Sequence, residues 1–172
     1  MTLREYVCGF VVAWALCACA GSSLVTVPVE PSVSPQQRLV AVREAGGGED
    51  TELQVQPLRD PQVEDLRLAA ERALAAGDIE TAVNALNQAL LIVGDDPAVL
   101  QERAEVALLQ ADYERVERLA RRAFDLGSRV GPLCRRHWAA IEQARLARGE
   151  DLNAASAHAQ IQACTVAGVT RM

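Results

Sequence analysis

The fold of this chain is set by two successive stretches, DPQVEDLRLAAERALAAGDIETAVNALNQALLIV (60–93) and DPAVLQERAEVALLQADYERVERLARRAFDL (96–126). Both begin with Asp-Pro, and a Gly-Pro pair at 131–132 opens a third stretch, so the starts are spaced by 36 and 35 residues. Asp and Gly are favoured at the N-cap of a helix, and Pro is favoured at the first helical position because its missing N–H would have no partner there. The regular spacing predicts an internal repeat.

A shift of 34 residues aligns the first stretch with the second. The matched pairs are Leu66/Leu100, Ala70/Ala104, Ala73/Ala107, Leu74/Leu108, Asp78/Asp112, Glu80/Glu114, Ala82/Val116, Ala89/Ala123 and Leu90/Phe124. Apolar positions recur at intervals of three and four, as on one face of a helix. Short breaks at Gly77-Asp78 and Ala111-Asp112 turn the second half of each stretch back along the first. Each unit is therefore predicted to be an antiparallel helix hairpin.

The units resemble the tetratricopeptide repeat, which has a bulky residue at position 4, small residues at 8, 20 and 27, and a Gly-Asp-Tyr-like turn at 15 to 17. The residues that match are Leu66, Ala70, Gly77-Asp78-Ile79, Ala82 and Ala89 in a first unit from Val63; Leu100, Ala104, Ala111-Asp112-Tyr113, Val116 and Ala123 in a second from Pro97; and Trp138 and Gly149-Glu150 in a third from Arg135. The third unit departs from the pattern, with Glu142 at a small position and one inserted residue before Leu152. The resemblance implies an all-α fold, in which three hairpins form a short solenoid over 60–164, followed by a tail at 165–172. A generic bundle of amphipathic helices is the alternative.

The first nineteen residues have the pattern of an export signal. Arg4 precedes an apolar run from Tyr6 to Leu16, which is shorter than the roughly 20 residues that cross a bilayer and has the length of a signal-peptide core. The next residues, Leu16-Cys17-Ala18-Cys19, resemble the bacterial lipobox, although Cys17 departs from the usual Ala, Ser or Thr. The resemblance implies that residues 1–18 are removed as a lipoprotein signal peptide. Cys19 would then carry a diacylglycerol and acyl chains such as palmitate, with the protein held at the outer membrane and facing the periplasm. An unlipidated signal peptide and a short uncleaved anchor are the alternatives.

Residues 19–59 are predicted to be a linker, because four prolines and Gly46-Gly47-Gly48 interrupt any helix there. Within this arm, Leu39-Val40-Ala41-Val42 and Leu53-Gln54-Val55-Gln56 flank the glycines, as in a β-hairpin over 38–57. An isolated two-stranded hairpin is marginal in water, so this one would need the helical domain or a partner to cover it. A flexible arm and an ordered hairpin both remain open.

Cys134 and Cys164 lie equally far from the predicted third turn at Gly149, so hairpin geometry places them side by side. In an oxidising periplasm such a pair is predicted to form a disulfide, worth roughly 3 kcal/mol for a loop of this length. A metal site is the alternative, because His137 lies one turn from Cys134. His158 lies six residues before Cys164 and points away from it, so no metal or cofactor is expected.

Composition argues against two classes of function. The net charge is −6 and the pI is about 5.0, which leaves no basic stripe to neutralise nucleic-acid phosphates. The two histidines, His137 and His158, lie in no recognisable nucleophile or metal motif, and no glycine-rich phosphate loop follows a strand. The chain is therefore predicted to be neither a nucleic-acid-binding protein nor an enzyme.

Two surfaces are candidates for binding a partner. In the repeat family the first helices of the units line a concave groove, and the polar positions of that groove correspond to Arg67, Glu71, Gln101, Glu105, Arg136 and Gln143. The second candidate is a basic patch of Arg115, Arg118, Arg121, Arg122 and Arg129, for which the alternative is a solvated face paired with Glu114, Glu117 and Asp125.

The leading hypothesis is a membrane-anchored periplasmic scaffold or adaptor that binds another envelope protein or a peptide segment of it. The alternatives are a non-catalytic activator or accessory subunit of a cell-wall enzyme, and a pilotin-like assembly helper. Self-association through the third hairpin is a further possibility.

Overall fold

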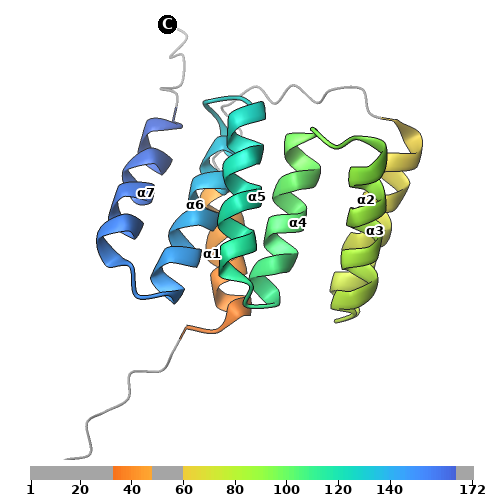
Figure 1. Ribbon diagram of the computed structural model, residues 1–172, viewed down its shortest axis with the longest axis horizontal. Helices are drawn as coiled ribbons and strands as arrows, with labels where there is room; N and C mark the ends of the chain where they lie inside the picture. The colour runs from red at the N-terminus through yellow and green to blue at the C-terminus, as the bar shows by residue number, and fades with distance from the viewer. Residues whose placement is uncertain (1–32, 48–59, 166–172) are drawn as a thin grey trace, which may run out of the picture. The chain divides into compact units, whose positions relative to one another are not determined.

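The computed structural model describes residues 33–47 and 60–165, which lie within one compact unit, Ser32–Met172. The regular structure in these ranges is entirely helical (Figure 1). The helices are α1 (Pro35–Gly46), α2 (Pro61–Ala75), α3 (Ile79–Ile92), α4 (Pro97–Leu109), α5 (Tyr113–Leu126), α6 (Pro132–Ala147) and α7 (Asp151–Ala163). The prediction of an all-α fold is confirmed. The predicted signal peptide, Cys19 and tail residues 166–172 lie outside the described residues.

The repeated Asp-Pro pairs start helices as predicted. The side chain of Asp60 accepts a hydrogen bond from the N–H of Gln62 at 2.8 Å, and that of Asp96 accepts one from the N–H of Ala98 at 2.8 Å. Caps of this kind stabilise a helix by about 1 kcal/mol each. Gly131 begins α6 without a side-chain hydrogen bond, so the third start depends on Pro132 and on backbone geometry alone.

A residue in the left-handed backbone conformation lies between the two helices of each hairpin. Gly77 has φ +77°, Gly149 has φ +73°, and Ala111 has φ +57° at the equivalent position of the second hairpin. Glycine adopts this conformation without strain, whereas an alanine Cβ there costs about 1 kcal/mol. The turn geometry is therefore the same in all three hairpins, and the second hairpin keeps it at an energetic cost.

The helices pair into three antiparallel hairpins, α2–α3, α4–α5 and α6–α7, that stack into a short solenoid (Figure 1). The small residues that the repeat pattern predicts, among them Ala70, Ala82, Ala104 and Val116, are buried. Small side chains let helix axes approach closely, which is how an Ala-rich chain with few aromatic residues forms a core. One apolar cluster lies mainly in the first hairpin, and a second joins the other two hairpins to α1.

Residues 35–46 form a helix, so the predicted β-hairpin over 38–57 is wrong for its first strand, and the arm is not free of helix. Pro35 occupies the first turn, where it starts the helix instead of interrupting it. The N–H of Gln37 donates to Ser34 Oγ at 3.2 Å, and the N–H of Ser34 donates to Gln37 Oε1 at 2.8 Å, which together form a capping box. The second predicted strand lies outside the described residues.

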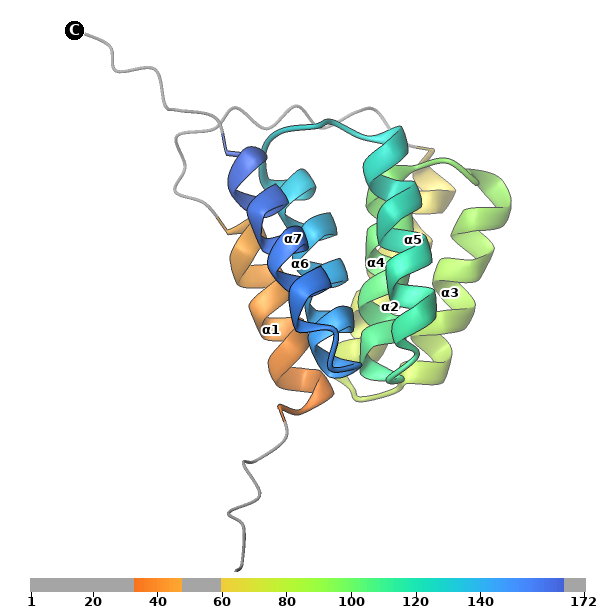
Figure 2. The same ribbon diagram turned by 60° about the vertical axis from the view of Figure 1, so that its left-hand side comes forward.

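Helix α1 packs against α6 and α4, and Figure 2 shows it apart from α5. Leu39 and Val42, which are three residues apart on one face of α1, are buried in the larger apolar cluster. The same apolar spacing that suggested a strand is thus satisfied by a helix face. The helical unit therefore includes α1 and is not confined to residues from 60 onward.

No helix within residues 33–47 and 60–165 combines the length and the apolar character needed to cross a membrane.

Candidate interaction site

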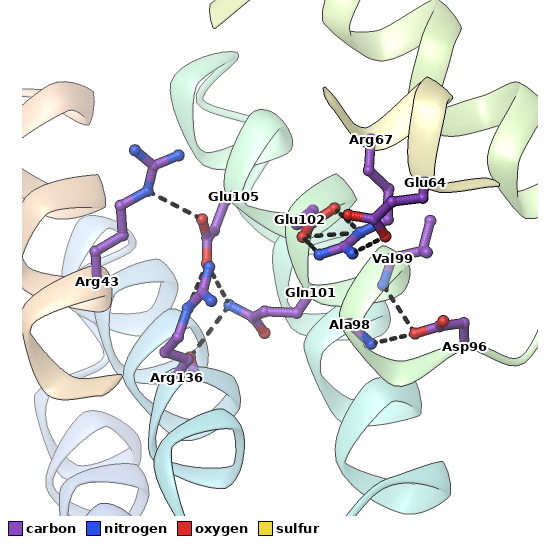
Figure 3. Close-up of polar contacts among 10 residues, drawn as sticks. All are labelled: Arg43, Glu64, Arg67, Asp96, Ala98, Val99, Gln101, Glu102, Glu105 and Arg136. Carbon is purple, nitrogen blue, oxygen red and sulfur yellow. Dashed lines mark hydrogen bonds and ion pairs between the residues drawn. The ribbon is translucent and has the colours of Figure 1, made fainter. Parts of the chain in front are cut away.

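A group of buried polar side chains lies where α1, α4 and α6 meet (Figure 3). Gln101 and Glu105 are one turn apart on α4 and therefore share a face. Glu105 Oε1 accepts hydrogen bonds from Arg136 Nε at 3.0 Å and from Gln101 Nε2 at 3.1 Å. Its other oxygen, Oε2, accepts from Arg43 Nε of α1 at 3.2 Å. The Glu105 carboxylate thus joins three helices.

The Glu105 carboxylate needs these arginines to replace its lost hydration, whereas the arginines are themselves only partly buried. The Glu105 side chain is only 2% exposed, whereas that of Arg136 is 28% exposed and that of Arg43 is 52% exposed. Taking a charged group out of water costs several kcal/mol unless opposite charges and hydrogen bonds replace its hydration. Both guanidinium groups retain some contact with solvent, but Glu105 has almost none.

His137 extends this group into the interface between α4 and α6. Its Nδ1 lies 2.7 Å from Gln101 Oε1. Since the Gln101 amide nitrogen donates to Glu105, its oxygen is left to accept, and His137 Nδ1 therefore carries the proton. Burial, and secondarily the charge of Arg136, lower the pKa of His137 to about 3, so the imidazole is neutral at physiological pH.

Two of the predicted groove residues are not accessible. Gln101 and Glu105 are 0% and 1% exposed, because α1 covers the α4 face on which they lie. The expectation that these side chains contact a partner directly is wrong for the arrangement in which α1 is in place. The repeat pattern placed both residues on one face of α4 but carried no information about the helix that covers this face.

The groove residues of α6 are also engaged by α1. Arg38 NH1 donates to the Gln143 side chain at 3.2 Å and to its backbone carbonyl at 3.3 Å. Gly46 passes so close to Arg136 that a Cβ on Gly46 would lie 2.3 Å from Arg136 Cγ. Arg135 Nε donates to the carbonyl of Ala45 at 3.0 Å. The contact between α1 and α6 therefore requires a glycine at position 46.

The groove residues of the first hairpin form a separate group. Arg67 Nε donates to Glu102 Oε2 at 2.9 Å, and Arg67 NH1 donates to Glu64 at 2.7 Å (Figure 3). These carboxylates raise the pKa of Arg67 above its usual range, chiefly through the hydrogen bond to Glu102. Glu71 lies on α2 and is exposed. The six predicted residues are thus split between α2, where Glu71 is exposed and Arg67 is paired and partly buried, and a region beneath α1.

The arginines of the proposed basic patch have partners within the chain. Arg121 stacks over Trp138 with 4.5 Å from guanidinium carbon to ring centroid, and Arg129 stacks over Phe124 at 4.2 Å. The remaining contacts are Arg115 to Asp112 at 2.9 Å, Arg118 to Glu114 at 3.8 Å and Arg122 to the Gly94 carbonyl at 3.0 Å. These contacts favour the interpretation of a solvated, internally paired face over that of an anion-binding patch.

The two C-terminal cysteines lie at the open end of the third hairpin, where the hairpin geometry predicts them. Their Cα atoms are 5.7 Å apart and their sulfurs 2.02 Å apart, which is a disulfide arrangement. The N–H of Gly131 donates to the carbonyl of Cys164 at 2.8 Å and ties the same two helix ends together. His137 Nδ1 pairs with Gln101 Oε1, and the described ranges contain no cluster of three metal-ligating side chains.

Two groups of functional interest have no signal in the repeat pattern. Arg38 and Arg43 belong to α1, a helix that was not predicted because the prolines and glycines around it indicated a linker. The pairing of His137 with Gln101 joins positions 36 residues apart, and only the superposition of the repeat units could have suggested it. The Ser34-Pro35-Gln36-Gln37 capping box was the one local sign that a helix begins here.

Comparison with known proteins gives a relative for this architecture. No protein-family model matches the chain, and no curated protein matches it. Among solved structures, the globular C-terminal domain of P. aeruginosa LpoP is similar, with 30% sequence identity and a TM-score of 0.58. The match covers 61% of this chain and 99% of that domain. With such identity over nearly the whole of the LpoP domain, the chain belongs to the family of the LpoP C-terminal domain.

Proposed function

We propose that this protein is a non-catalytic accessory subunit that activates a cell-wall enzyme in the bacterial envelope. The observation that carries the proposal is its kinship with the C-terminal domain of LpoP. Of the roles that the sequence left open, this kinship favours the accessory subunit of a cell-wall enzyme over a general adaptor. A short solenoid that recognises its partner through surface shape and charge suits such a role, because helical repeats act as scaffolds.

Lipid attachment at Cys19 would hold this subunit at the outer membrane, facing the periplasm. Thirteen residues, 20–32, separate Cys19 from Val33. Even fully extended, a segment of that length spans at most about 50 Å. The helical unit would therefore work close to the membrane, and its partner would have to reach it there. A flexible linker that continued to residue 59 would have allowed the helical unit to lie farther from the membrane.

In-cell photocrosslinking tests the proposal, with the photoreactive residue placed at exposed positions on different helices. Glu71 on α2 and Leu152 on α7 are both exposed, and neither substitution disturbs the buried group around Glu105. We expect a crosslink from at least one of these positions to a peptidoglycan synthase or hydrolase. The purified enzyme should then turn over faster when the chain from residue 20 onward is added at saturation.

Two results would contradict the accessory role. One is a captured cell-wall enzyme whose rate does not change at saturating chain. The other is a crosslink only to an outer-membrane pore subunit or to the chain itself, which would favour the assembly-helper role or self-association. Measurement of the molecular mass in solution separates the last two, because self-association doubles the mass in the absence of any partner.

A further inference from the structure

Helix α1 lies against the α4 and α6 faces in the way that a bound peptide helix would. It presents two apolar side chains, Leu39 and Val42, to the core. Directly after Val42, Arg43 reaches Glu105. Gly46, one turn further on, allows close approach to α6. These features together define a short recognition pattern: two apolar residues three apart, an arginine next, and a glycine three residues later.

The surface beneath α1 has a charged group that suits this pattern. Glu105 Oε1 is held by Arg136 and Gln101, both of which belong to the solenoid itself. Glu105 Oε2 is held by Arg43 alone among the described residues. Departure of α1 would thus leave a carboxylate already oriented by two neighbours, with one oxygen lacking a cation. A guanidinium group from another helix would satisfy that oxygen equally well.

Helix α1 is attached to a distant part of the chain, because it packs mainly on α6 and α4 and not on α2, the next helix in sequence. The large apolar side chains that it buries are Leu39 and Val42. Its side-chain hydrogen bonds to the solenoid come from two arginines, Arg38 and Arg43, and Arg43 is half-exposed. A partner helix that displaces α1 therefore has to replace two buried apolar side chains and the hydrogen bonds of these two arginines.

We propose that α1 is an intramolecular ligand of a helix-binding face on α4 and α6, and that an amphipathic partner helix carrying an arginine displaces it to bind Glu105. The face is then closed in the free protein and opens when the partner competes with α1. The choice of a cell-wall enzyme as the source of this helix rests on the function proposed above. The existence of the face and its resident ligand does not.

A peptide in trans tests the face directly. The probe is a fluorescent synthetic peptide of residues Val33–Gly47, added to the chain from residue 20 onward. In a Leu39→Glu chain the resident α1 loses an apolar contact, and we expect the probe to bind at least tenfold more tightly than it binds the unmodified chain. An Arg43→Gln probe should bind about tenfold more weakly than the native probe, as for one lost charge-assisted hydrogen bond. A Glu44→Gln probe, changed at an exposed position, is the matched control.

The proposal is overturned if the Leu39→Glu chain is folded by circular dichroism and does not bind the probe. It is also overturned if the Arg43→Gln probe binds as tightly as the native one. Should the variant fail to fold, amide hydrogen exchange of the unmodified chain decides, since α1 must exchange at least tenfold faster than α6. A second variant, Gly46→Ala, pushes α1 from Arg136 and should speed that exchange, whereas Gly47→Ala, with no contact under 3.4 Å, should not.

Hydrogen exchange in the complex separates this proposal from the accessory role. When a captured cell-wall enzyme binds, α1 should exchange faster than in the free chain, and α4 should stay protected. If the enzyme is activated but α1 exchange is unchanged, displacement is wrong and the accessory role stands. If the probe binds the opened face but no cell-wall enzyme responds to the chain, the helix-binding face stands and the accessory role fails.

Discussion

Loss of the Cys134–Cys164 crosslink should lower the free energy of unfolding by about 3.5 kcal/mol. The two cysteines are separated by 30 residues along the chain, and the entropy of closing a loop of that size gives this value at 25 °C. The bond joins the first turn of α6 to Cys164 at the end of α7. Without it, α7 is held by its packing on α6, by the turn at Gly149 and by the hydrogen bond from the Gly131 N–H to the Cys164 carbonyl. The crosslink therefore acts on the third hairpin.

The assay is thermal unfolding of the chain from residue 20 onward, followed by circular dichroism, for the protein with both cysteines and for Cys134→Ala, Cys164→Ala and the double variant. The structure describes about 120 residues, for which the entropy of unfolding is roughly 0.25 kcal/mol/K, so Tm should fall by about 14 °C. Either substitution alone destroys the bond. The free energy of unfolding of the double variant should therefore lie within about 1 kcal/mol of the values for the single variants.

Two observations would refute this reasoning. If the Tm of the native chain and that of the fully reduced chain agree within about 2 °C, the crosslink adds no stability. If the effects of the two single substitutions add in the double variant, the cysteines contribute as separate buried side chains and not as a bond.

Three further predictions concern single positions. Ala111→Gly should stabilise the chain by about 1 kcal/mol in urea unfolding, because glycine adopts φ +57° without strain; a loss of stability would contradict the turn geometry. The folded-state pKa of His137, at about 3, lies below its unfolded value, so stability should be complete above pH 6.5 and fall by about 2–3 kcal/mol by pH 4.5. This loss of stability at low pH should be absent in His137→Leu and present in the control His158→Gln. If both variants show it, groups other than His137 cause it. Glu117, whose pKa is lowered because hydrogen bonds from two arginines outweigh its burial, should lose about 1–2 kcal/mol on replacement by Gln, whereas Glu114→Gln at an 82% exposed side chain should change stability by less than about 0.5 kcal/mol.

The solenoid could be predicted from sequence because its signals are local. An Asp-Pro pair fixes a helix start through one side-chain hydrogen bond and one fixed dihedral angle, and both lie within three residues. The small residues at repeat positions, such as Ala70 and Ala104, then indicate which helix faces approach one another. The Cys134–Cys164 arrangement followed from the same regularity, because an antiparallel hairpin relates residues at equal distance from its turn.

Helix α1 could not be predicted with the same confidence, because its apolar spacing fits two structures. Leu39, Val40 and Val42 satisfy both the alternation of a strand and the three-residue spacing of a helix. The choice between them is made by the α4 and α6 faces, which lie roughly 60 to 100 residues away in sequence, and by the capping box at Ser34. The same distance explains why Glu105 was predicted to be accessible, since nothing near residue 105 indicates that Arg43 reaches it.

The buried Glu105 distinguishes a role in recognition from a role in stability. A buried ion pair is on average no more stabilising than apolar residues of similar volume, because desolvation cancels most of the attraction. Replacing Glu105 and Arg136 together by Met should therefore leave the free energy of unfolding within about 1 kcal/mol of the original value, or raise it. Replacing Glu105 alone should destabilise the chain by more than the pair does, because Arg136 then loses its main partner.

Recognition should respond differently to the same paired substitution. With Glu105 and Arg136 both replaced by Met in a Leu39→Glu chain, the native Val33–Gly47 probe and its Arg43→Gln form should bind with equal affinity, since the carboxylate that tells them apart is gone. If the paired variant unfolds more readily by several kcal/mol, Glu105 serves stability first. If it stays stable and still prefers the arginine-bearing probe, Arg43 is recognised by a group other than Glu105, and the charge at this face does not select the helix that occupies it.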